Sequence, residues 1–443
     1  MICRFDLLRF AACFDNLFLS VVRLCPLGAR AAACRQIEKI HVRGEQNSIA
    51  PVSEAKRMHG TIKMSASADV TIPVIDISAL LPTDASSGNK TCREKVSPEE
   101  REVAQQLDDA ARNFGFFYLT GCCRPTTLAG RRSESSKNAD GSMIDVEEIL
   151  NHGRLIFSLD SDSKKKMRAQ SGEGPGWEPP GAQNLDEGRL GDLLGMEKGV
   201  DAAASGGGGD LKESYIVSNM TGKGGVLQAR WPPSAAATLN GFQDSIEAYH
   251  GNCRNISAAV MRGFAIALGC RPTVFEDDIA DPFTKLRMLK YPAKNAAHYT
   301  PEHSPGCGSH TDWGLLTLLV QDDVGGLEVC VPSTSICNES SGPTCSKGEP
   351  IWIHVPQRDG AILANVGDML LRWTNGRYRS APHRVLQPLK DNADRYSIAF
   401  FINGNADAMI DAGRLLPDEV PKWSPITSMD YILERVAATY SDA

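Results

Sequence analysis

The spacing of hydrophobic and polar positions changes at about residue 285. Before that point, apolar residues recur every three or four positions in several long segments, which is the spacing of one buried helix face. The clearest segment follows Ser97 and carries acidic residues in its first turn, as expected for a capped helix start. The predicted helices are 98–113, 146–157 and 235–268. Gly241 and Gly251 are candidate interruptions of the last helix. Apolar runs at 72–77 and 114–119 predict strands.

After residue 285 the pattern consists of short apolar runs rich in β-branched and aromatic residues, separated by Gly, Pro, Asn or Asp. Such runs predict strands. They are residues 286–291, 315–320, 327–331, 351–355, 369–373, 383–386 and 396–402. Helices followed by many short strands indicate a mainly β fold with flanking helices. We therefore expect a double-stranded β-helix, which is a jelly-roll or cupin-like barrel.

Local composition predicts four regions along the chain. Residues 1–63 are rich in arginine and poor in acidic residues, so they are either a transit peptide or a spurious upstream extension. Residues 70–275 form a helix and strand region that contains a glycine-rich insertion at 172–225. The barrel core spans 280–405, with a polar loop insertion at 333–348, and 406–443 form a C-terminal tail or helix.

Composition and charge restrict the functional class. Of the 443 residues, 42% are hydrophobic and 23% are charged, which is typical of a globular protein. Apolar runs are too short for a membrane span, and the net charge of −7 argues against nucleic acid as a partner. An odd count of 13 cysteines without paired spacing indicates reduced thiols. We expect a cytoplasmic monomer with a small-molecule substrate, or an organellar protein if residues 1–63 are a transit peptide.

The strand-rich region contains a candidate metal site. His310 and Asp312 stand two residues apart, so on a strand both side chains point to the same face. His383 lies on a later strand-like run. Two histidines and one carboxylate on one side of a metal leave its other positions open, which is typical of non-haem Fe(II) oxygenases. A zinc site and a surface histidine beside a turn aspartate are the alternatives that these residues leave open.

A second polar group follows the last histidine of this set. With a period of two, Arg395, Ser397, Ala399 and Phe401 share one strand face. Arginine makes a planar, two-pronged match to a carboxylate, and the aromatic ring can cover the bound group. Turn-forming residues at 390–393 predict that His383 and Arg395 lie on adjacent arms of a hairpin. The residues therefore predict a carboxylate site beside the metal site.

With these motifs in this order, the sequence resembles the 2-oxoglutarate- and Fe(II)-dependent dioxygenases of the isopenicillin-N-synthase-like superfamily, in its plant and fungal branch. The resemblance runs from about Thr71 to the C-terminus. It rests on the segments 72–77, 114–121, 212–215, 310–319, 365–368, 373–376 and 383–385.

This resemblance implies a role for each matching residue. His310, Asp312 and His383 would bind Fe(II), and Arg395, Ser397 and Tyr291 would hold the distal carboxylate of 2-oxoglutarate. With O₂ as the second cosubstrate and ascorbate as an optional reductant, the enzyme would oxidise a small organic molecule, by hydroxylation, and release succinate and CO₂. Candidate substrate contacts are Phe401, Trp313 and Tyr215.

Three other functions are compatible with parts of this pattern. An iron oxidase of the same superfamily that does not consume 2-oxoglutarate can retain the Arg-x-Ser motif, and succinate formation separates the two. A jelly-roll binding protein without turnover would not need the complete set of metal ligands. A zinc hydrolase would need a positioned general base, which the sequence does not offer, and it would leave Arg395 without a role.

Overall fold

A computed structural model divides the chain into two compact units, Met1–Ser67 and Ala68–Ala443. The structure describes only residues of the second unit, and the described ranges are 71–82, 94–124, 143–170, 174–183, 210–219, 227–232, 239–293, 306–332, 350–386, 388, 390 and 392–440. The extension 1–63, the loop insertion 333–348 and the central part of the glycine-rich insertion lie outside the described residues.

The largest element of the described fold is an eight-stranded mixed sheet. Its strand order is β1-β2-β10-β7-β12-β5-β4-β3. The strands are β1 (Val74–Asp76), β2 (Phe116–Thr120), β3 (Gly176–Glu178), β4 (Glu213–Ser218), β5 (Thr284–Tyr291), β7 (Leu316–Gln321), β10 (Ile362–Val366) and β12 (Arg395–Ile402). Strands far apart in sequence are neighbours in this sheet, so it brings the N-terminal and C-terminal parts of the unit together.

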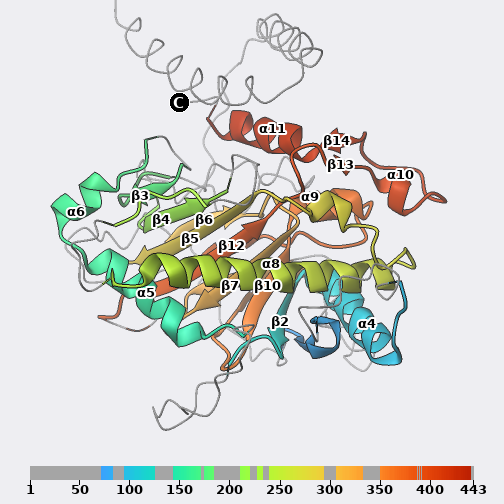
Figure 1. Cartoon of the computed structure of the whole chain (residues 1–443), viewed down its shortest axis with the longest axis horizontal. Helices are drawn as coiled ribbons and strands as arrows, with labels where there is room; N and C mark the ends of the chain where they lie inside the picture. The colour runs from blue at the N-terminus through green and yellow to red at the C-terminus, as the bar shows by residue number, and fades with distance from the viewer. Residues whose placement is uncertain are drawn as a thin grey trace, which may run out of the picture. The chain divides into compact units, whose positions relative to one another are not determined.

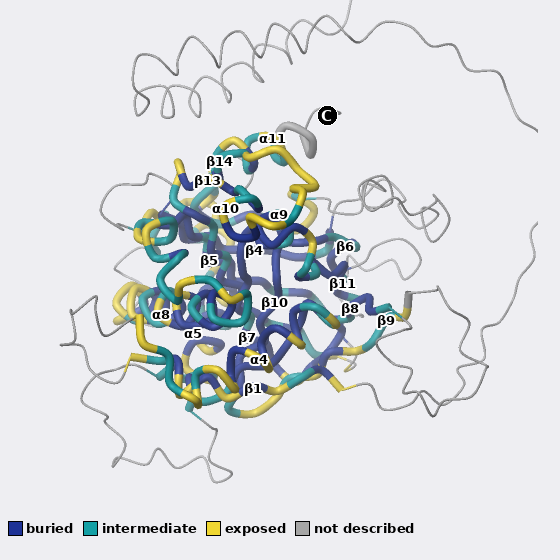
Figure 2. The backbone as a smooth tube through the Cα atoms, turned by 90° about the vertical axis from the view of Figure 1, so that its right-hand side faces the viewer, coloured by how far each residue is buried: buried dark blue, intermediate teal, exposed yellow. Residues whose placement is uncertain are grey.

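A four-stranded sheet packs against one face of this large sheet. Its order is β6 (Cys307–His310), β11 (His383–Val385), β8 (Leu327–Pro332) and β9 (Pro350–His354). Buried residues of both sheets, such as Leu289 of β5 and Val329 of β8, share one apolar cluster. Figure 2 shows the buried strands of the large sheet between this smaller sheet and the helices. The candidate metal and carboxylate residues lie on strands that border the space between the two sheets.

Helices cover the other face of the large sheet (Figure 1). The principal ones are α4 (Pro98–Asn113), α5 (Val146–Ser158) and α8 (Phe242–Ala267), and α6 (Ser161–Lys166) follows α5. Ser97 and Glu100 form the capping box that the sequence predicts for α4. The C-terminal part contains α9 (Asp368–Trp373), β13 (Met409–Ile410), α10 (Ala412–Leu415), β14 (Ile426–Thr427) and α11 (Ser428–Tyr440).

The fold class agrees with the sequence prediction in its main feature, which is β-sheet with flanking helices. Within the described part of the chain the strands pair as separate sheets and not as one closed barrel. Helix α8 begins after Gly241, which has a positive φ of 74°, and continues through Gly251 without a break. None of the described helices has both the length and the apolar composition needed to cross a membrane.

One predicted strand is wrong, because residues 369–373 belong to helix α9. Periodicity cannot separate a short, mostly apolar strand from a short, mostly apolar helix. Tertiary contacts determine the helical conformation of these residues. The first backbone N–H groups of α9 bond to carbonyls of the loop after β6, with Asp368 N donating to Asp312 O at 2.7 Å. Helix α9 therefore supports the loop that carries one of the candidate metal ligands.

Candidate metal centre and adjoining pocket

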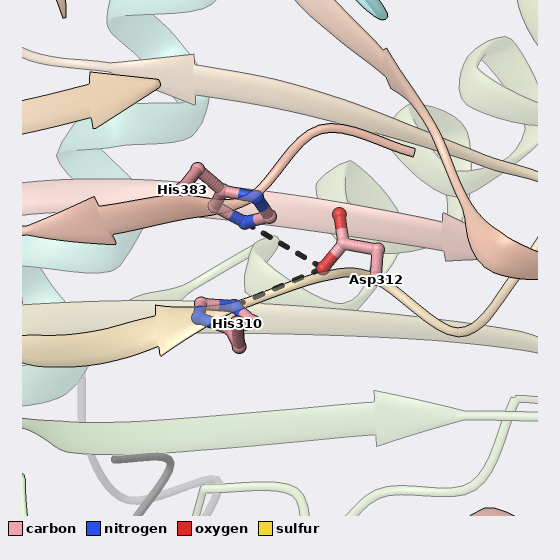
Figure 3. A group of neighbouring side chains, drawn as sticks. All are labelled: His310, Asp312 and His383. Atoms are coloured by element: carbon pink, nitrogen blue, oxygen red, sulfur yellow. Dashed lines mark ion pairs between the residues drawn. The ribbon is translucent and has the colours of Figure 1, made fainter. Parts of the chain in front are cut away.

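The three predicted metal ligands meet between the two sheets. His310 ends β6 and His383 begins β11, and the antiparallel pairing of these strands places the two residues opposite each other. Their Nε2 atoms lie 3.9 and 3.7 Å from Oδ1 of Asp312, and both rings point towards this carboxylate (Figure 3). The ligand atoms of all three residues lie within 4.8 Å of one another. Asp312 lies in the loop after β6 rather than on the strand, so loop geometry and not strand periodicity brings it to the histidines.

The hydrogen bond made by Nδ1 of each imidazole leaves Nε2 as the nitrogen available to a metal. Nδ1 of His310 lies 2.8 Å from the carbonyl of Gly308, and Nδ1 of His383 lies 3.2 Å from that of Ala381. A carbonyl can only accept, so each Nδ1 carries the proton and each Nε2 presents its lone pair towards Asp312. Metal-binding histidines are held in this way by backbone carbonyls.

The carboxylate of Asp312 is held by two donors that the sequence prediction did not assign. Oδ2 accepts hydrogen bonds from Thr317 Oγ1 at 2.6 Å and from Asn365 Nδ2 at 2.7 Å. Thr317 of β7 and Asn365 of β10 are register partners in the large sheet. These bonds occupy Oδ2 and leave Oδ1, the oxygen nearest to both histidines, for a metal. A polar residue within an otherwise apolar buried strand is the sequence signal for such a donor.

The electrostatics of this group favour the protonation states that a divalent metal requires. Burial and the neighbouring His310 lower the pKa of His383 to about 4, so its imidazole is neutral at pH 7. Burial alone would raise the pKa of Asp312, but the two histidines and the hydrogen bonds from Asn365 and Thr317 outweigh it and lower the net pKa. The neutral imidazole of His383 and the ionised carboxylate of Asp312, together with the imidazole of His310, form a donor set that fits Fe(II).

Arg395 is a fully buried guanidinium, with 1% of its surface exposed. Its two terminal nitrogens donate to Ser397 Oγ at 3.1 Å and Gln321 Oε1 at 2.7 Å, and its Nε has no hydrogen-bond partner among the described residues. The guanidinium carbon lies 4.9 Å from the centre of the Tyr291 ring. In the described ranges no carboxylate forms an ion pair with Arg395. The charge of Arg395 counteracts the burial that raises the pKa of Asp322, so these two groups interact through space. A buried guanidinium without a direct ion-pair partner suits an anionic ligand.

A pocket of about 80 Å³ connects the guanidinium with the metal ligands. Ser397, Ala399 and Phe401 line it together with Arg395, as their period of two on β12 predicts. The predicted hairpin is wrong, because β11 belongs to the small sheet and β12 to the large sheet. His383 and Arg395 therefore approach the pocket from different sheets.

The three candidate substrate contacts have different positions. Phe401 lines the pocket. Tyr215 is fully buried in the core on the helix side of β4, where its hydroxyl donates to the carbonyl of Arg230 at 3.1 Å. Trp313 packs at the edge of this core near Arg435, whose guanidinium carbon lies 5.9 Å from its ring centre. Of the three, the pocket therefore brings only Phe401 together with the metal ligands.

Two buried ion pairs also border the pocket, and sequence reasoning gave neither a role. Lys212 Nζ lies 2.7 Å from Asp210 Oδ2, and Lys212 Nζ also contacts Cys307 Sγ at 3.2 Å. Arg287 of β5 lies 2.6 Å from Glu178 Oε2 of β3. Lys212, Cys307 and Arg287 all line the pocket. Its walls are therefore charged on the β4 and β5 side and apolar around Phe401.

The chain is similar to several known proteins. The sequence profile of the 2OG-Fe(II) oxygenase superfamily matches residues 283–404, which include all three candidate ligands and Arg395. The N-terminal profile of the non-haem dioxygenases in morphine synthesis matches residues 72–214. A homoarginine-6-hydroxylase from Glycine max is 31% identical over 348 residues, covering 77% of this chain and 88% of the relative.

The chain belongs to the 2OG-Fe(II) oxygenase superfamily. A further relative is the 2-oxoglutarate-dependent dioxygenase citB of Monascus ruber, 28% identical, with 85% of this chain and 98% of the relative covered. A solved structure of a full-length Neurospora crassa protein in complex with alpha-KG superposes with a TM-score of 0.60 at 26% identity, covering 83% of this chain and 96% of the Neurospora chain. This superfamily member is accordingly a 2-oxoglutarate-dependent dioxygenase, an oxidoreductase that uses Fe(II).

Proposed function

We propose that this dioxygenase binds Fe(II) through His310, Asp312 and His383 and hydroxylates a small polar molecule. The reaction consumes the substrate, O₂ and 2-oxoglutarate and yields the alcohol, succinate and CO₂. The observation that carries the assignment is the directed donor set, in which two Nε2 lone pairs and one carboxylate oxygen converge while their other polar atoms are already bonded. Fe(II), when bound, supplies the activation of O₂ that is coupled to decarboxylation of 2-oxoglutarate.

The residues around the metal site have distinct tasks in this proposal. Arg395 and Ser397, beside the Tyr291 ring, bind the distal carboxylate and so orient the keto acid end towards the metal ligands. The edge of the Phe116 ring packs on His383, with ring centres 5.3 Å apart, and limits rotation of this imidazole. Asp312 and His383 are buried, so water is excluded from the side of the metal site that these two residues form.

The proposed substrate class follows from the pocket walls and from relatives. Arg287, which is paired with Glu178 behind it, presents a polar surface, and Phe401 and Leu289 present an apolar one. A small molecule with hydrogen-bonding groups and an apolar face matches both. One relative is named a homoarginine-6-hydroxylase, and the Neurospora protein has also been solved with thymine. Both molecules are small and polar, which supports this class.

The test is succinate release by the full chain with Fe(II), 2-oxoglutarate and a panel that includes homoarginine and thymine. We expect succinate and an oxidised product in equal amounts with at least one polar compound, and none with Asp312→Ala. Asp430→Ala, on the surface of α11, is the control and should keep full activity. Absence of succinate with every compound, together with absence of an anaerobic complex between the iron protein and 2-oxoglutarate, would contradict the proposal.

A further inference from the structure

Lys212 lies at the same end of the pocket as Arg395. It directly precedes β4, in which Glu213 pairs with Lys290 of β5. One step further along this antiparallel ladder, Lys212 stands beside Tyr291, and Tyr291 pairs with Arg395 of β12. Cross-strand neighbours point to the same face of a sheet. Lys212, Tyr291 and Arg395 therefore form one row across three strands, with the phenol between two cations, and all three line the pocket.

The ammonium group of Lys212 is oriented and keeps one donor available. It is buried, with 4% of the side chain exposed, and donates to Asp210 and Cys307. An ammonium has three N–H donors, and within the described ranges no third acceptor is seen. Burial lowers its pKa, but Cys307 and Asp210 more than compensate, so the net pKa is raised and the group is charged.

Two cations and two carboxylates contribute charge at this end of the pocket. Lys212 is paired directly with Asp210, and Arg395 interacts through space with Asp322. Arg287, the next cation on the pocket wall, is paired with Glu178. The phenol of Tyr291 stands between the two cations and adds a neutral polar group to the row. A carboxylate placed over Tyr291 would lie between the ammonium group of Lys212 and the guanidinium of Arg395 and could accept hydrogen bonds from both.

We propose that Lys212 is a second cationic contact for the distal carboxylate of 2-oxoglutarate, opposite Arg395 across the Tyr291 ring. The inference rests on the proposed function, because it assigns a further residue to the cosubstrate pocket of the same site. Asp210 and Cys307 act as positioning residues that hold the ammonium group in this row. The residue therefore helps the pocket to select a keto acid with a second carboxylate.

The experiment compares two keto acids in the same iron-loaded protein under anaerobic conditions. 2-Oxopentanoate carries a methyl group where 2-oxoglutarate carries its distal carboxylate, and both are titrated by the absorbance of their Fe(II) complexes. In Lys212→Met we expect the affinity for 2-oxoglutarate to fall roughly 10- to 100-fold, as for loss of one hydrogen bond to a charged group. The affinity for 2-oxopentanoate should change less than about threefold, since it lacks the group that Lys212 binds.

Lys290→Met is the matched control. Lys290 neighbours Tyr291 on β5 and is also ion-paired, with Asp394 at 3.1 Å, but it points to the opposite face and does not line the pocket. We expect wild-type affinity for both acids in this variant. If Lys212→Met does not fold, Lys212→Gln replaces it, and the ratio of the two affinities within one preparation is independent of the folded fraction.

Three results would overturn the inference. An equal fall for both acids would make Lys212 a structural residue, and unchanged binding of 2-oxoglutarate would exclude the contact. If the wild-type protein formed no complex with 2-oxoglutarate, the proposed function would fail together with the inference. Failure of the inference alone is recognised when the wild type binds 2-oxoglutarate normally and Lys212→Met shows either unchanged binding or an equal fall for both acids.

Discussion

Asn365 provides a direct test of how the protein prepares Asp312 for a metal. The change Asn365→Leu keeps the approximate size of the side chain and removes one of the two donors to Oδ2. A hydrogen bond to a charged group contributes about 1.5–3 kcal/mol, and loss of such a partner of a metal ligand typically costs 10- to 100-fold in metal affinity. Because Thr317 still holds the same oxygen, we expect the lower end, about tenfold, and about 100-fold in the double variant with Thr317→Val.

The assay is anaerobic competition for Fe(II) between the protein and a coloured chelator, with Mn(II) calorimetry as a second measurement. Asn219→Leu serves as the control, because Asn219 is equally buried and hydrogen-bonded, to Thr284 and the carbonyl of Pro282, but lies outside the pocket. It should lower the free energy of unfolding and leave metal affinity unchanged. Wild-type metal affinity in Asn365→Leu would refute the view that Oδ2 is the restrained oxygen.

Three further predictions concern buried ionisable side chains. Arg395→Ala should bind iron normally but lose about 30- to several-thousand-fold in affinity for 2-oxoglutarate in anaerobic titration; wild-type affinity would place the cosubstrate elsewhere. Burial lowers the pKa of His250 to about 4, so the unfolded chain binds the proton first, and stability present above pH 6.5 is lost as the pH falls. In urea unfolding, the free energy of unfolding of the wild type should fall between pH 7 and pH 5 by about 2 kcal/mol more than that of His250→Gln. An equal fall in both proteins would contradict this. Arg435→Leu leaves the buried Asp368 carboxylate without its ion-pair partner and should cost about 3 kcal/mol in urea unfolding, part of which Asp368→Asn should restore; no recovery in the double variant would count against the pair.

The sequence was informative where local spacing carries the structure. The period of two on residues 395–401 predicted which side chains line the pocket, because a strand alternates its faces whatever it pairs with. Helix α4 was predicted with its bounds, since its capping box and apolar spacing are both local. The three candidate metal ligands could be named because they combine a short motif with a resemblance to a family.

The features that the sequence could not supply depend on long-range pairing. Thr317 and Asn365 meet Asp312 only because β7 and β10 pair in one register. Lys212 reaches the row of Arg395 through β5, which lies between their strands. The assignment of β11 and β12 to different sheets is likewise a matter of topology, which turn residues between two strands do not determine. Periodicity assigns a side chain to a face, and sheet order decides which faces meet.

Binding of 2-oxoglutarate at Arg395 would also affect the stability of the folded protein. A ligand that binds only the folded state raises its stability by an amount that grows with concentration, about 2.7 kcal/mol at 100 times its dissociation constant. The folded fraction, and with it the share that proteases remove, would then follow the 2-oxoglutarate level.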